Sequence, residues 1–469
     1  MRVPGLSFQS LWRDEVDAIR FSNESLPELL RGMARAGHNG PLYFLILRGW
    51  RALTGDTEFA LRFFSAAWGV LMVPLVYVVA RRLRLSRGAS SATSLLVATA
   101  PYLIWYSQEA KMYTLLAGLV LLALAAYLTA LRGGSAGWWV IFTVAASLSL
   151  YTHILATLAL VVYGLLAPIY WLLERPDPKP IKGWSLSIAC LTLPYVPLAI
   201  WQFPLLRQAL QNGLDTGHRF YPLPDQVRLL LGLYNRGVVY PPFEPSATIL
   251  SLFLLLAGLF LGTGSRRRSG VMWRRSVLLV WLGLPVLLAF FVSRRAPVFE
   301  DRYLIYIAPA YYMLIALGVL GTRRYSRPLA LGCLGAFIAI NLWGVWRQAT
   351  LPIKADFRAA AAFIEERVLA EARPAVMLQI PYLQYTFDYY FQPEFKLVEG
   401  IWTNDGRSPD AVAAEMQTRL DDVEHVWLVV SEEEMWDRRG LTRGWLEEHA
   451  RLVEEAHFRR VDVYQYLMD

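Results

Sequence analysis

The sequence predicts an α-helical membrane protein of many spans, followed by a smaller soluble α/β domain. Of its 469 residues, 55% are hydrophobic and only 18% are charged, which is typical of a chain that lies mostly in lipid. About ten apolar stretches approach the length needed to cross the roughly 30 Å hydrocarbon core of a bilayer. Charged residues become frequent again after about residue 347. We therefore expect a membrane domain at 1–346 and a soluble domain at 347–469.

The composition also excludes several other classes of protein. An aromatic content of 13% with 32 Gly and 26 Pro argues against a disordered or collagen-like chain. Only two cysteines are present, Cys190 and Cys333, and both lie in apolar runs, which excludes a disulfide-stabilised secreted fold. The net charge of +8 comes largely from arginines in short connectors rather than on one amphipathic face, so we expect no nucleic-acid partner.

The expected spans follow an outer segment at 1–59. A span needs roughly 17 to 25 mostly apolar residues, and two of the candidates are short. The candidates lie at 60–80, 89–106, 112–131, 137–152, 154–173, 184–202, 246–263, 275–293, 303–321 and 327–346.

The charges of the connectors predict the orientation of these spans. Four basic connectors fall on one side of the alternation, namely RRLRLSR, ERPDPKPIK, RRRSGVMWRR and TRRYSR. Because Lys and Arg accumulate in cytoplasmic loops, that side is expected to be the cytoplasm. The other side receives 1–59, the SQEAK turn, the YTH corner at 151–153, a loop at 203–245, the SRRAPVFEDR connector and everything after about residue 347. We thus expect a multi-pass protein of the cell membrane with an extracytoplasmic carboxy-terminal domain.

The amino terminus requires a separate explanation. Residues 1–59 hold no apolar span, yet the alternation places them outside the cell. We expect either a further apolar helix encoded upstream of Met1 or translocation of this segment with the first span as a short hairpin, and we favour the upstream helix.

The soluble domain alternates helix and strand patterns. Three segments predict helices: FRAAAAFIEERVLAEA, YLQYTFDYYF and PDAVAAEMQTRL. Three others predict strands: PAVMLQI, HVWLVVS and RRVDVYQYLM. Because this part contains no Gly-rich phosphate loop and no metal-ligand spacing, we expect a small α/β sandwich that acts as a lid or as a platform for an acceptor.

Carboxylates in the first outer segment are the candidates for a general base. LWRDEVDAIRFS brings Asp14 and Glu15 together among apolar neighbours. An apolar wall or a second carboxylate raises the pKa of a carboxyl group and makes it a better base. The alternative is a solvated acidic turn in which Asp14 caps a helix.

Cations on the outer side are the candidates for a phosphate site. SQEAKMYTLL carries Glu109 and Lys111, and SRRAPVFEDRY carries Arg295, Arg302 and Tyr303. Arginine binds phosphate oxygens bidentately and lysine binds them as a point charge. The alternatives are that Lys111 extends toward lipid headgroups and that Arg302 forms a structural ion pair with Glu109 or Asp301.

Three further outer positions carry weaker signals. His38 in AGHNGPLYF can cap a helix, donate a proton or bind phosphate, and His153 lies at the YTH corner. A lone histidine is more often structural than functional. The 203–245 loop, which carries His218 and several arginines, is long enough to suggest a functional lid, but the sequence does not single out a residue.

Six motifs in chain order resemble bacterial polytopic GT-C glycosyltransferases, most nearly the protein O-mannosyltransferase-like and aminoarabinose-transferase-like branches. The motifs are WRDEVD, HNGPLYFLIL, LRFFSAAWGVL, SQEAKMY, DRYLIYIAPAYY and KADFRAAAAFI. The resemblance implies a GT-C type bundle, a polyprenyl-phosphate sugar as donor, an extracytoplasmic protein, lipid or envelope glycan as acceptor, and an inverting mechanism.

The resemblance also implies roles for individual residues. Asp14 matches the base that deprotonates the acceptor, and Glu15 matches the residue that supports it. Lys111 and Arg302 match the cations on the lipid phosphate, with Glu109 and Arg295 beside them. His38 and Tyr303 are weaker matches, because the family's histidine is usually followed by two prolines and Asn39 and Gly40 replace the first of these here.

No cofactor is expected, and a divalent metal is not required, because Lys and Arg can stabilise a leaving phosphate in its place. Two other classes of protein stay open. One is a non-catalytic envelope assembly or binding protein. The other is a flippase or transporter of lipid-linked sugars. Proteins of this class are expected to have ionisable residues at mid-membrane depth. The identities of the sugar and acceptor are not readable from the sequence.

Overall fold

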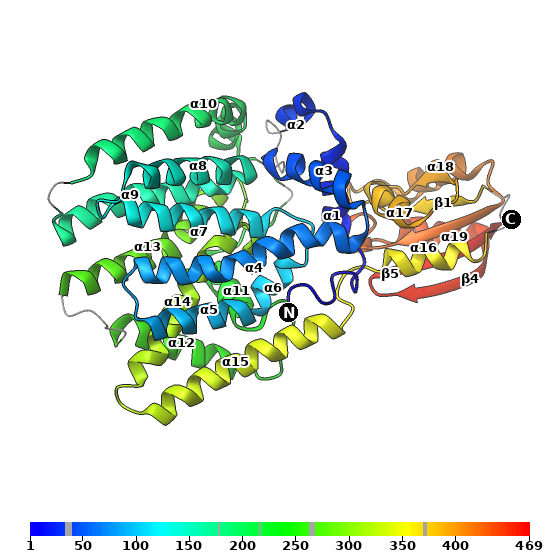
Figure 1. Ribbon diagram of the computed structural model, residues 1–469. Coiled ribbons are helices and arrows are strands. Elements are labelled where there is room, and N and C mark those ends of the chain that lie inside the picture. Colours follow the sequence, from blue (N-terminus) through cyan, green and yellow to red (C-terminus); the bar gives the residue numbers. More distant parts are fainter. Residues whose placement is uncertain (33–39, 177–178, 215, 217, 262–267, 369–372) are drawn as a thin grey trace. The chain divides into compact units, whose positions relative to one another are not determined.

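The computed structural model divides the chain into two compact units (Figure 1). It describes residues 1–32, 40–176, 179–214, 216, 218–261, 268–368 and 373–469. The first unit comprises Met1–Leu6 and Phe21–Thr350, and the second comprises Ser7–Arg20 and Leu351–Asp469. The segment at 7–20, which the sequence-based division places in the membrane domain, therefore folds with the carboxy-terminal unit.

The first unit is a bundle of helices. Helix α1 (Arg13–Asn23) contributes its end to this unit and its beginning to the second. The remaining helices are α2 (Leu26–Gly32), α3 (Leu42–Thr54), α4 (Glu58–Arg82), α5 (Arg87–Thr99), α6 (Pro101–Ser107), α7 (Tyr113–Ala130), α8 (Ala136–Thr152), η1 (Ile154–Ala156), α9 (Thr157–Glu174), α10 (Ile181–Asn212), α11 (Leu223–Arg236), α12 (Glu244–Phe260), α13 (Arg268–Ser293), η2 (Asp301–Ile307), α14 (Ala308–Thr322) and α15 (Arg327–Thr350).

The predicted polytopic helical fold is confirmed, and each predicted span overlaps one or more helices. Within the described residues, six helical stretches are long and apolar enough to cross a membrane, and three apolar helices are shorter. The six are Glu58–Arg82, Tyr113–Ala130, Ile154–Glu174, Ser269–Ser293, Asp301–Thr322 and Arg327–Thr350. The stretch predicted as one span at 89–106 is two helices. Pro101 lacks an N–H and holds Ala100 in an extended conformation, so α5 ends and α6 begins there.

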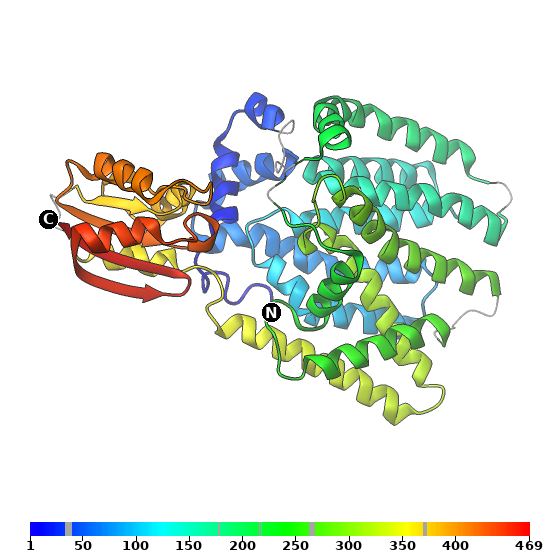
Figure 2. The same ribbon diagram turned by 180° about the vertical axis from the view of Figure 1, so that it is seen from behind.

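The predicted loop at 203–245 is wrong over most of its length. Helix α10 continues to Asn212 and ends at Gly213, whose φ of 75° favours glycine. Helix α11 then begins after Pro222, with a proline in its first turn, and buries Leu230, Leu233 and Tyr234. This helix packs against α12 and α6, and it comes to the front when the bundle is seen from behind (Figure 2). Among the described residues of this stretch, 213, 214, 216, 218–222 and 237–243 lie in connectors, and the prolines and arginines of the helices occupy helix ends and exposed faces.

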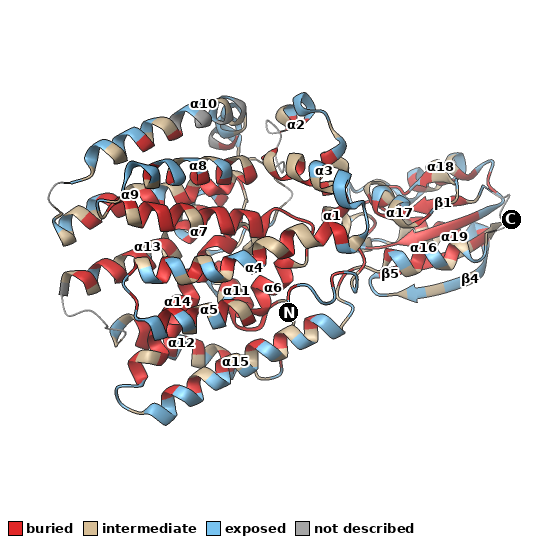
Figure 3. Cartoon of the chain, viewed as in Figure 1, coloured by how far each residue is buried: buried red, intermediate tan, exposed pale blue. Residues whose placement is uncertain are grey.

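Two helices form the centre of the bundle. Helices α7 and α14 are buried along almost their whole length (Figure 3). Helix α7 packs against α4 and α8, and α14 packs against α12 and α5. A Cβ atom added to Gly258 would lie 2.1 Å from the Leu314 carbonyl oxygen, and one added to Gly318 would lie 2.0 Å from that of Leu254. Glycine at both positions therefore allows α12 and α14 to approach backbone to backbone.

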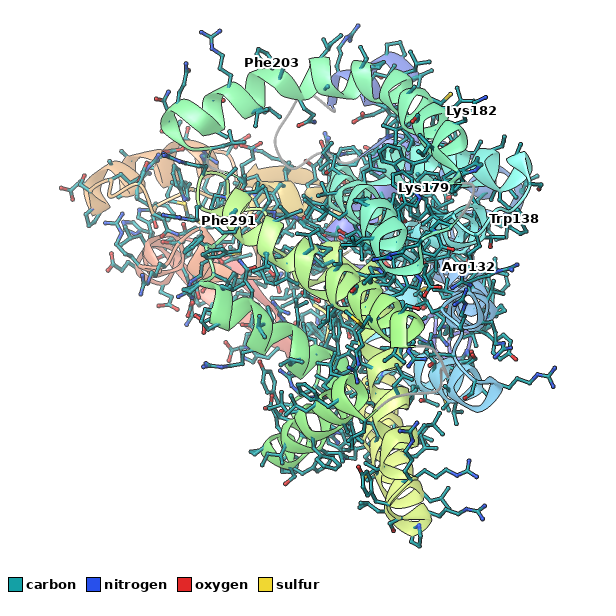
Figure 4. All side chains as sticks on the ribbon, turned by 90° about the vertical axis from the view of Figure 1, so that its left-hand side faces the viewer. Arg132, Trp138, Lys179, Lys182, Phe203 and Phe291 are labelled. Atoms are coloured by element: carbon teal, nitrogen blue, oxygen red, sulfur yellow. The ribbon has the colours of Figure 1, made fainter. Side chains whose placement is uncertain are left out.

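Basic connectors gather at one end of this unit. Arg84 in the α4–α5 connector pairs with Glu174 at the end of α9, at 3.1 Å. In Figure 4, Arg132, Trp138, Lys179 and Lys182 lie toward one end of the bundle, and Phe203 and Phe291 lie toward the other. The helices thus bring together connectors of like charge, which is the arrangement on which the predicted orientation rests.

The second unit contains a five-stranded mixed sheet in the order β2-β1-β3-β5-β4. Strand β1 pairs in parallel with β2 and β3, and β5 pairs antiparallel with β3 and β4. The strands are β1 (Ala375–Leu378), β2 (Lys396–Glu399), β3 (His425–Val430), β4 (Ala450–Phe458) and β5 (Val461–Met468). The helices are α16 (Phe357–Glu365), η3 (Pro381–Leu383), α17 (Gln384–Tyr390), α18 (Pro409–Leu420), η4 (Glu433–Met435) and α19 (Leu441–His449).

Helices cover both faces of this sheet, as the alternation along β3 shows. Val426 and Leu428 pack in one core with α18 and α19, whereas Trp427 and Val429 pack in the other with α16 and α17. The predicted α/β sandwich is therefore confirmed. The sequence did not indicate β2, β4 or α19. Strand β4 is an exposed edge with glutamates in its middle, so it lacks the apolar alternation of a half-buried strand.

Candidate functional site

Three separate connectors of the first unit meet in a cation cluster, which we define as Lys111, His153, Arg302 and Tyr303. The His153 and Tyr303 rings lie 4.7 Å apart between centroids. The charges of both Arg302 and Lys111 act on the His153 ring. Lys111 comes from the α6–α7 turn, His153 from the end of α8, and the other two from η2. The structure thus brings together two of the predicted phosphate cations, Lys111 and Arg302, and two of the weaker candidates, His153 and Tyr303.

The turn that carries Lys111 is fixed by helix α4. Ser65 Oγ donates to the Lys111 carbonyl oxygen at 3.0 Å, and Thr114 Oγ1 donates to the Ser65 carbonyl oxygen at 2.8 Å. Lys111 is only 7% exposed and its neighbour Glu109 only 2%. A lysine reaching for lipid headgroups is expected to be exposed at its tip, so this burial favours an internal role for Lys111.

Aromatic rings surround the Arg302 guanidinium. Its carbon atom lies 6.0 Å from the centroid of the Tyr113 ring and 5.7 Å from that of Tyr303. The ring of Tyr106 in turn packs edge-on against Tyr113, at 5.5 Å. A cation placed near aromatic faces is stabilised by the ring quadrupoles.

Two tyrosines of α6 hold Asp301, the first residue of η2, beside the cluster. Tyr106 Oη donates to Asp301 Oδ2 at 2.8 Å, and Tyr102 Oη donates to the Asp301 carbonyl oxygen at 2.9 Å. Asp301, Glu109 and Arg302 all act electrostatically on the Tyr106 hydroxyl, which places Glu109 at the edge of the cluster. Two tyrosines of α6 therefore position the residue that precedes Arg302.

The connector at 213–222 also reaches the cluster. His218 Nδ1 lies 3.2 Å from Glu300 Oε1, and its Nε2 lies 3.5 Å from Tyr303 Oη. The same connector contributes residues 219–222 to a cavity of about 550 Å³, which α11 and Glu244 also line. This short connector is therefore the part of the predicted functional loop that touches the candidate site.

The acidic pair lies in the second unit and its two members differ in environment. Glu15 is fully buried, and its Oε2 lies 2.8 Å from Nζ of Lys354, which is also buried. Asp14 is half-buried in the first turn of α1, which begins at Arg13, so Asp14 is not the N-cap. The negative charge of Asp14 is stabilised there by the helix dipole.

Side chains of the same unit fasten the segment that carries this pair. Gln9 Nε2 donates to the Leu351 carbonyl oxygen at 2.6 Å, and Gln9 Oε1 accepts from the Ile353 N–H at 2.9 Å. Ser10 Oγ donates to Asp356 Oδ1 at 2.6 Å, and the same oxygen accepts from Ala359 N and caps α16. The motif KADFRAAAAFI therefore holds the acidic pair as well as starting a helix.

Two predicted site residues are not part of the described cluster. The Arg295 side chain is exposed, and its carbonyl oxygen accepts from Leu214 N at 2.9 Å. His38 lies outside the described residues. Gly40, which follows it, lies against Tyr151, and an added Cβ would be 2.0 Å from the Tyr151 carbonyl oxygen. This contact explains why glycine, rather than proline, stands there.

Sequence reasoning missed Lys354 and gave little weight to His153 and His218. Lys354 begins a recognised motif, but only the folded unit shows that it faces Glu15. His153 carried one signal, its position at an outer corner between two apolar runs. Within the described parts of the chain, no group of three or more His, Cys, Asp or Glu residues is placed to hold a metal ion.

Comparison with protein families gives one regional match. The family model of dolichyl-phosphate-mannose-protein mannosyltransferases matches residues 38–201, the stretch that carries Lys111 and His153. A search of curated proteins gave no match.

Comparison with solved structures extends over nearly the whole chain. ArnT from Cupriavidus metallidurans, bound to undecaprenyl phosphate, is similar with a TM-score of 0.59 and 15% identity, over 99% of this chain and 95% of that one. The Archaeoglobus fulgidus oligosaccharyltransferase, in complex with Zn and sulfate, has a TM-score of 0.58 and 12% identity, over 99% and 70% of the chains. The arabinofuranosyltransferase AftD from Mycobacteria has a TM-score of 0.52 and 15% identity, over 99% and 40%.

Proposed function

We propose that this chain, which has the fold of the GT-C membrane glycosyltransferases, transfers a sugar from a polyprenyl-phosphate donor to an extracytoplasmic acceptor. The transfer inverts the configuration at the anomeric carbon. The acceptor is a protein, a lipid or an envelope glycan, and both the cation cluster and the second unit lie on the extracytoplasmic side of the cell membrane.

The meeting of Lys111 and Arg302 at buried His153 is the observation that carries this proposal. Two fixed cations with little water around them stabilise a phosphate more strongly than they do in bulk solvent. Their connectors belong to a helix bundle with apolar helices, which suits a lipid tail. ArnT bound to undecaprenyl phosphate, and the Archaeoglobus fulgidus oligosaccharyltransferase AglB in complex with an inhibitory peptide and a dolichol phosphate, have a similar fold, which supports this class of ligand.

In the proposed reaction, the acceptor hydroxyl attacks the anomeric carbon while Asp14 takes the hydroxyl proton. The bond from the anomeric carbon to the phosphate oxygen breaks, and its electron pair stays on the phosphate. Polyprenyl phosphate then leaves, and Lys111 and Arg302 stabilise the charge that develops on it. Glu109 and Tyr303 stand beside these cations. One carboxylate base is sufficient for a single inverting displacement, whereas a double displacement requires a nucleophile as well.

Glu15 serves this reaction through position rather than through proton transfer. Its carboxylate is fully buried, and Oε2 lies 2.8 Å from Nζ of Lys354. The pair fastens the start of α1, where Asp14 is the residue directly before Glu15. We therefore assign the base to Asp14 and the orienting role to Glu15.

The experiment is a transfer assay with a panel of radiolabelled polyprenyl-phosphate sugars and envelope extract, using the full-length protein in nanodiscs. Wild type is expected to label an acceptor from one donor. Lys111→Gln and Arg302→Gln are each expected to slow transfer by about 10² to 10³-fold, as loss of one charge-stabilising group does. Lys182→Gln, which changes an exposed lysine at the start of α10, is the matched control.

Other outcomes favour other classes of protein. If wild type binds a donor but labels no acceptor, the protein is a binding or assembly component. If it moves the donor across a bilayer without breaking the sugar-phosphate bond, it is a flippase. Either outcome contradicts the proposed transfer.

A further inference from the structure

His153 carries a buried hydrogen-bonding atom that the fold does not satisfy. Its side chain is 1% exposed, and Nε2 has no hydrogen-bond partner among the described residues. Buried polar atoms usually have a partner, so an unsatisfied donor in a candidate site is a candidate contact for a ligand.

The other ring nitrogen determines which proton His153 carries. The backbone N–H of Leu155 donates to Nδ1 at 3.1 Å, so Nδ1 acts as an acceptor and bears no proton. Burial, with smaller contributions from the charges of Arg302 and Lys111, lowers the pKa of His153 to about 3. The ring is therefore neutral near pH 7, and its single proton is on Nε2.

The groups around Nε2 indicate which kind of atom accepts its hydrogen bond. The charged groups that act on the ring are Arg302 and Lys111, whose side chains have only donors to offer. Tyr303 presents its ring to His153, at 4.7 Å between centroids, while its hydroxyl oxygen lies 3.5 Å from Nε2 of His218. An N–H beside two cations is best matched by an oxygen of an anion.

We propose that the Nε2–H of His153 is a third donor to the phosphate of the polyprenyl-phosphate ligand, together with Lys111 and Arg302. This assignment rests on the proposed function and adds a binding residue to its donor site. The Leu155 N–H fixes the tautomer before the ligand arrives, so the N–H points to the phosphate without a change of protonation. A neutral donor also adds no third positive charge to the buried pair of cations.

Three substitutions test the role of this atom in the full-length protein. His153→Gln places an amide N–H near the position of Nε2, whereas His153→Asn places its amide near the position of Nδ1, and His153→Phe keeps the ring without a donor. The probes are undecaprenyl monophosphate and undecaprenol, whose binding to each variant in nanodiscs is measured by native mass spectrometry. Thermal unfolding identifies any variant that fails to fold.

Phosphate binding is expected to weaken about 10 to 100-fold in His153→Phe and His153→Asn, as for loss of one hydrogen bond to a charged group. His153→Gln is expected to recover most of it, and undecaprenol binding is expected to be the same in all variants. Equal phosphate affinity in wild type and a folded His153→Phe overturns the proposal, and so does equal loss in the Gln and Phe variants.

The ring itself gives a second measurement. Nitrogen-15 NMR of histidine-labelled protein is expected to show His153 protonated at Nε2 and not at Nδ1, with the Nε2 signal moving when undecaprenyl phosphate is added. A proton on Nδ1 contradicts the assignment.

Failure of this inference differs from failure of the proposed function. If undecaprenyl phosphate binds, Lys111→Gln weakens it and His153→Phe does not, only the role of His153 is wrong. If wild type binds no polyprenyl phosphate at all, the donor site itself is wrong, and both proposals fall.

Discussion

Nζ of Lys354 lies 2.8 Å from Oε2 of Glu15, although 339 residues separate them in the sequence. Both side chains are buried, and both belong to the second unit. The contact gives different roles to two adjacent carboxylates. Glu15 anchors the segment at 7–20, whereas half-buried Asp14 has the exposure that a general base needs to meet an acceptor.

Removing one member of this pair is expected to destabilise the second unit. Glu15→Gln removes the carboxylate that lies 2.8 Å from the buried Lys354 ammonium, and breaking a buried ion pair typically lowers the free energy of unfolding by about 3–5 kcal/mol. The double variant Glu15→Leu with Lys354→Met removes both charges and is expected to regain most of this loss. Hydrogen exchange of peptides from 351–469 measures the effect. Equal protection in the single variant and wild type contradicts the role given to the pair.

The stability of the first unit is expected to depend on pH through His153. Its pKa lies at about 3 in the folded protein and at 6.5 when unperturbed. Since the folded pKa is depressed, this contribution is fully present above about pH 6.5 and is lost as pH falls toward 3. Between pH 6.5 and 4.5 the loss is on the order of 2–3 kcal/mol.

Thermal unfolding of wild type and His153→Gln across this range isolates the contribution, since glutamine does not titrate. The difference in stability between the two proteins is expected to shift in favour of the variant as the pH falls. A constant difference shows that His153 is already charged or exposed in the folded protein.

Because α12 and α14 are in close contact, a side chain at Gly318 is expected to destabilise the first unit. A Cβ there would lie 2.0 Å from the Leu254 carbonyl oxygen, so Gly318→Ala forces the two backbones apart. Displacements of this kind typically destabilise by about 1–3 kcal/mol. Gly283→Ala is the control, because a Cβ at Gly283 meets nothing within 4 Å. Thermal unfolding in detergent compares the two, and equal stability contradicts the described helix contact.

Removal of divalent metal is expected to leave transfer unchanged. In the proposed reaction Lys111 and Arg302 stabilise the leaving phosphate, which is a role that a metal ion plays in other enzymes. Transfer is measured before and after dialysis against EDTA, and then with added Mg²⁺, Mn²⁺ or Zn²⁺. A loss of activity that one of these ions restores contradicts this part of the mechanism.

The membrane part of the fold could be predicted because apolar runs depend on local composition. Pro101 divides one of these runs into α5 and α6, because proline disfavours a helical conformation in the residue before it. In α11, Leu230 and Leu233 are buried while prolines and arginines stand around them, so the helical period was hidden. Strand β4 was missed because an edge strand buries too little to alternate.

The candidate site could be predicted by residue type but not by contact. Lys111 and Arg302 stood out as cations on the expected outer side, and the structure brings both to His153. Their meeting depends on how α7, α8 and η2 pack, which no local pattern encodes. Lys354 could not be predicted for the same reason. A lysine before a helix is common, and only the fold brings it into contact with Glu15.

The central claim is that Asp14 is the base of a sugar transfer from polyprenyl phosphate. It is tested most directly by the initial rate of transfer in nanodiscs for wild type, Asp14→Asn and the control Asp17→Asn, whose carboxylate pairs with Arg20 at the surface of the same segment. We predict a loss of about 10² to 10⁴-fold in Asp14→Asn, with donor binding retained and Asp17→Asn close to wild type. Equal rates in wild type and Asp14→Asn would contradict the claim.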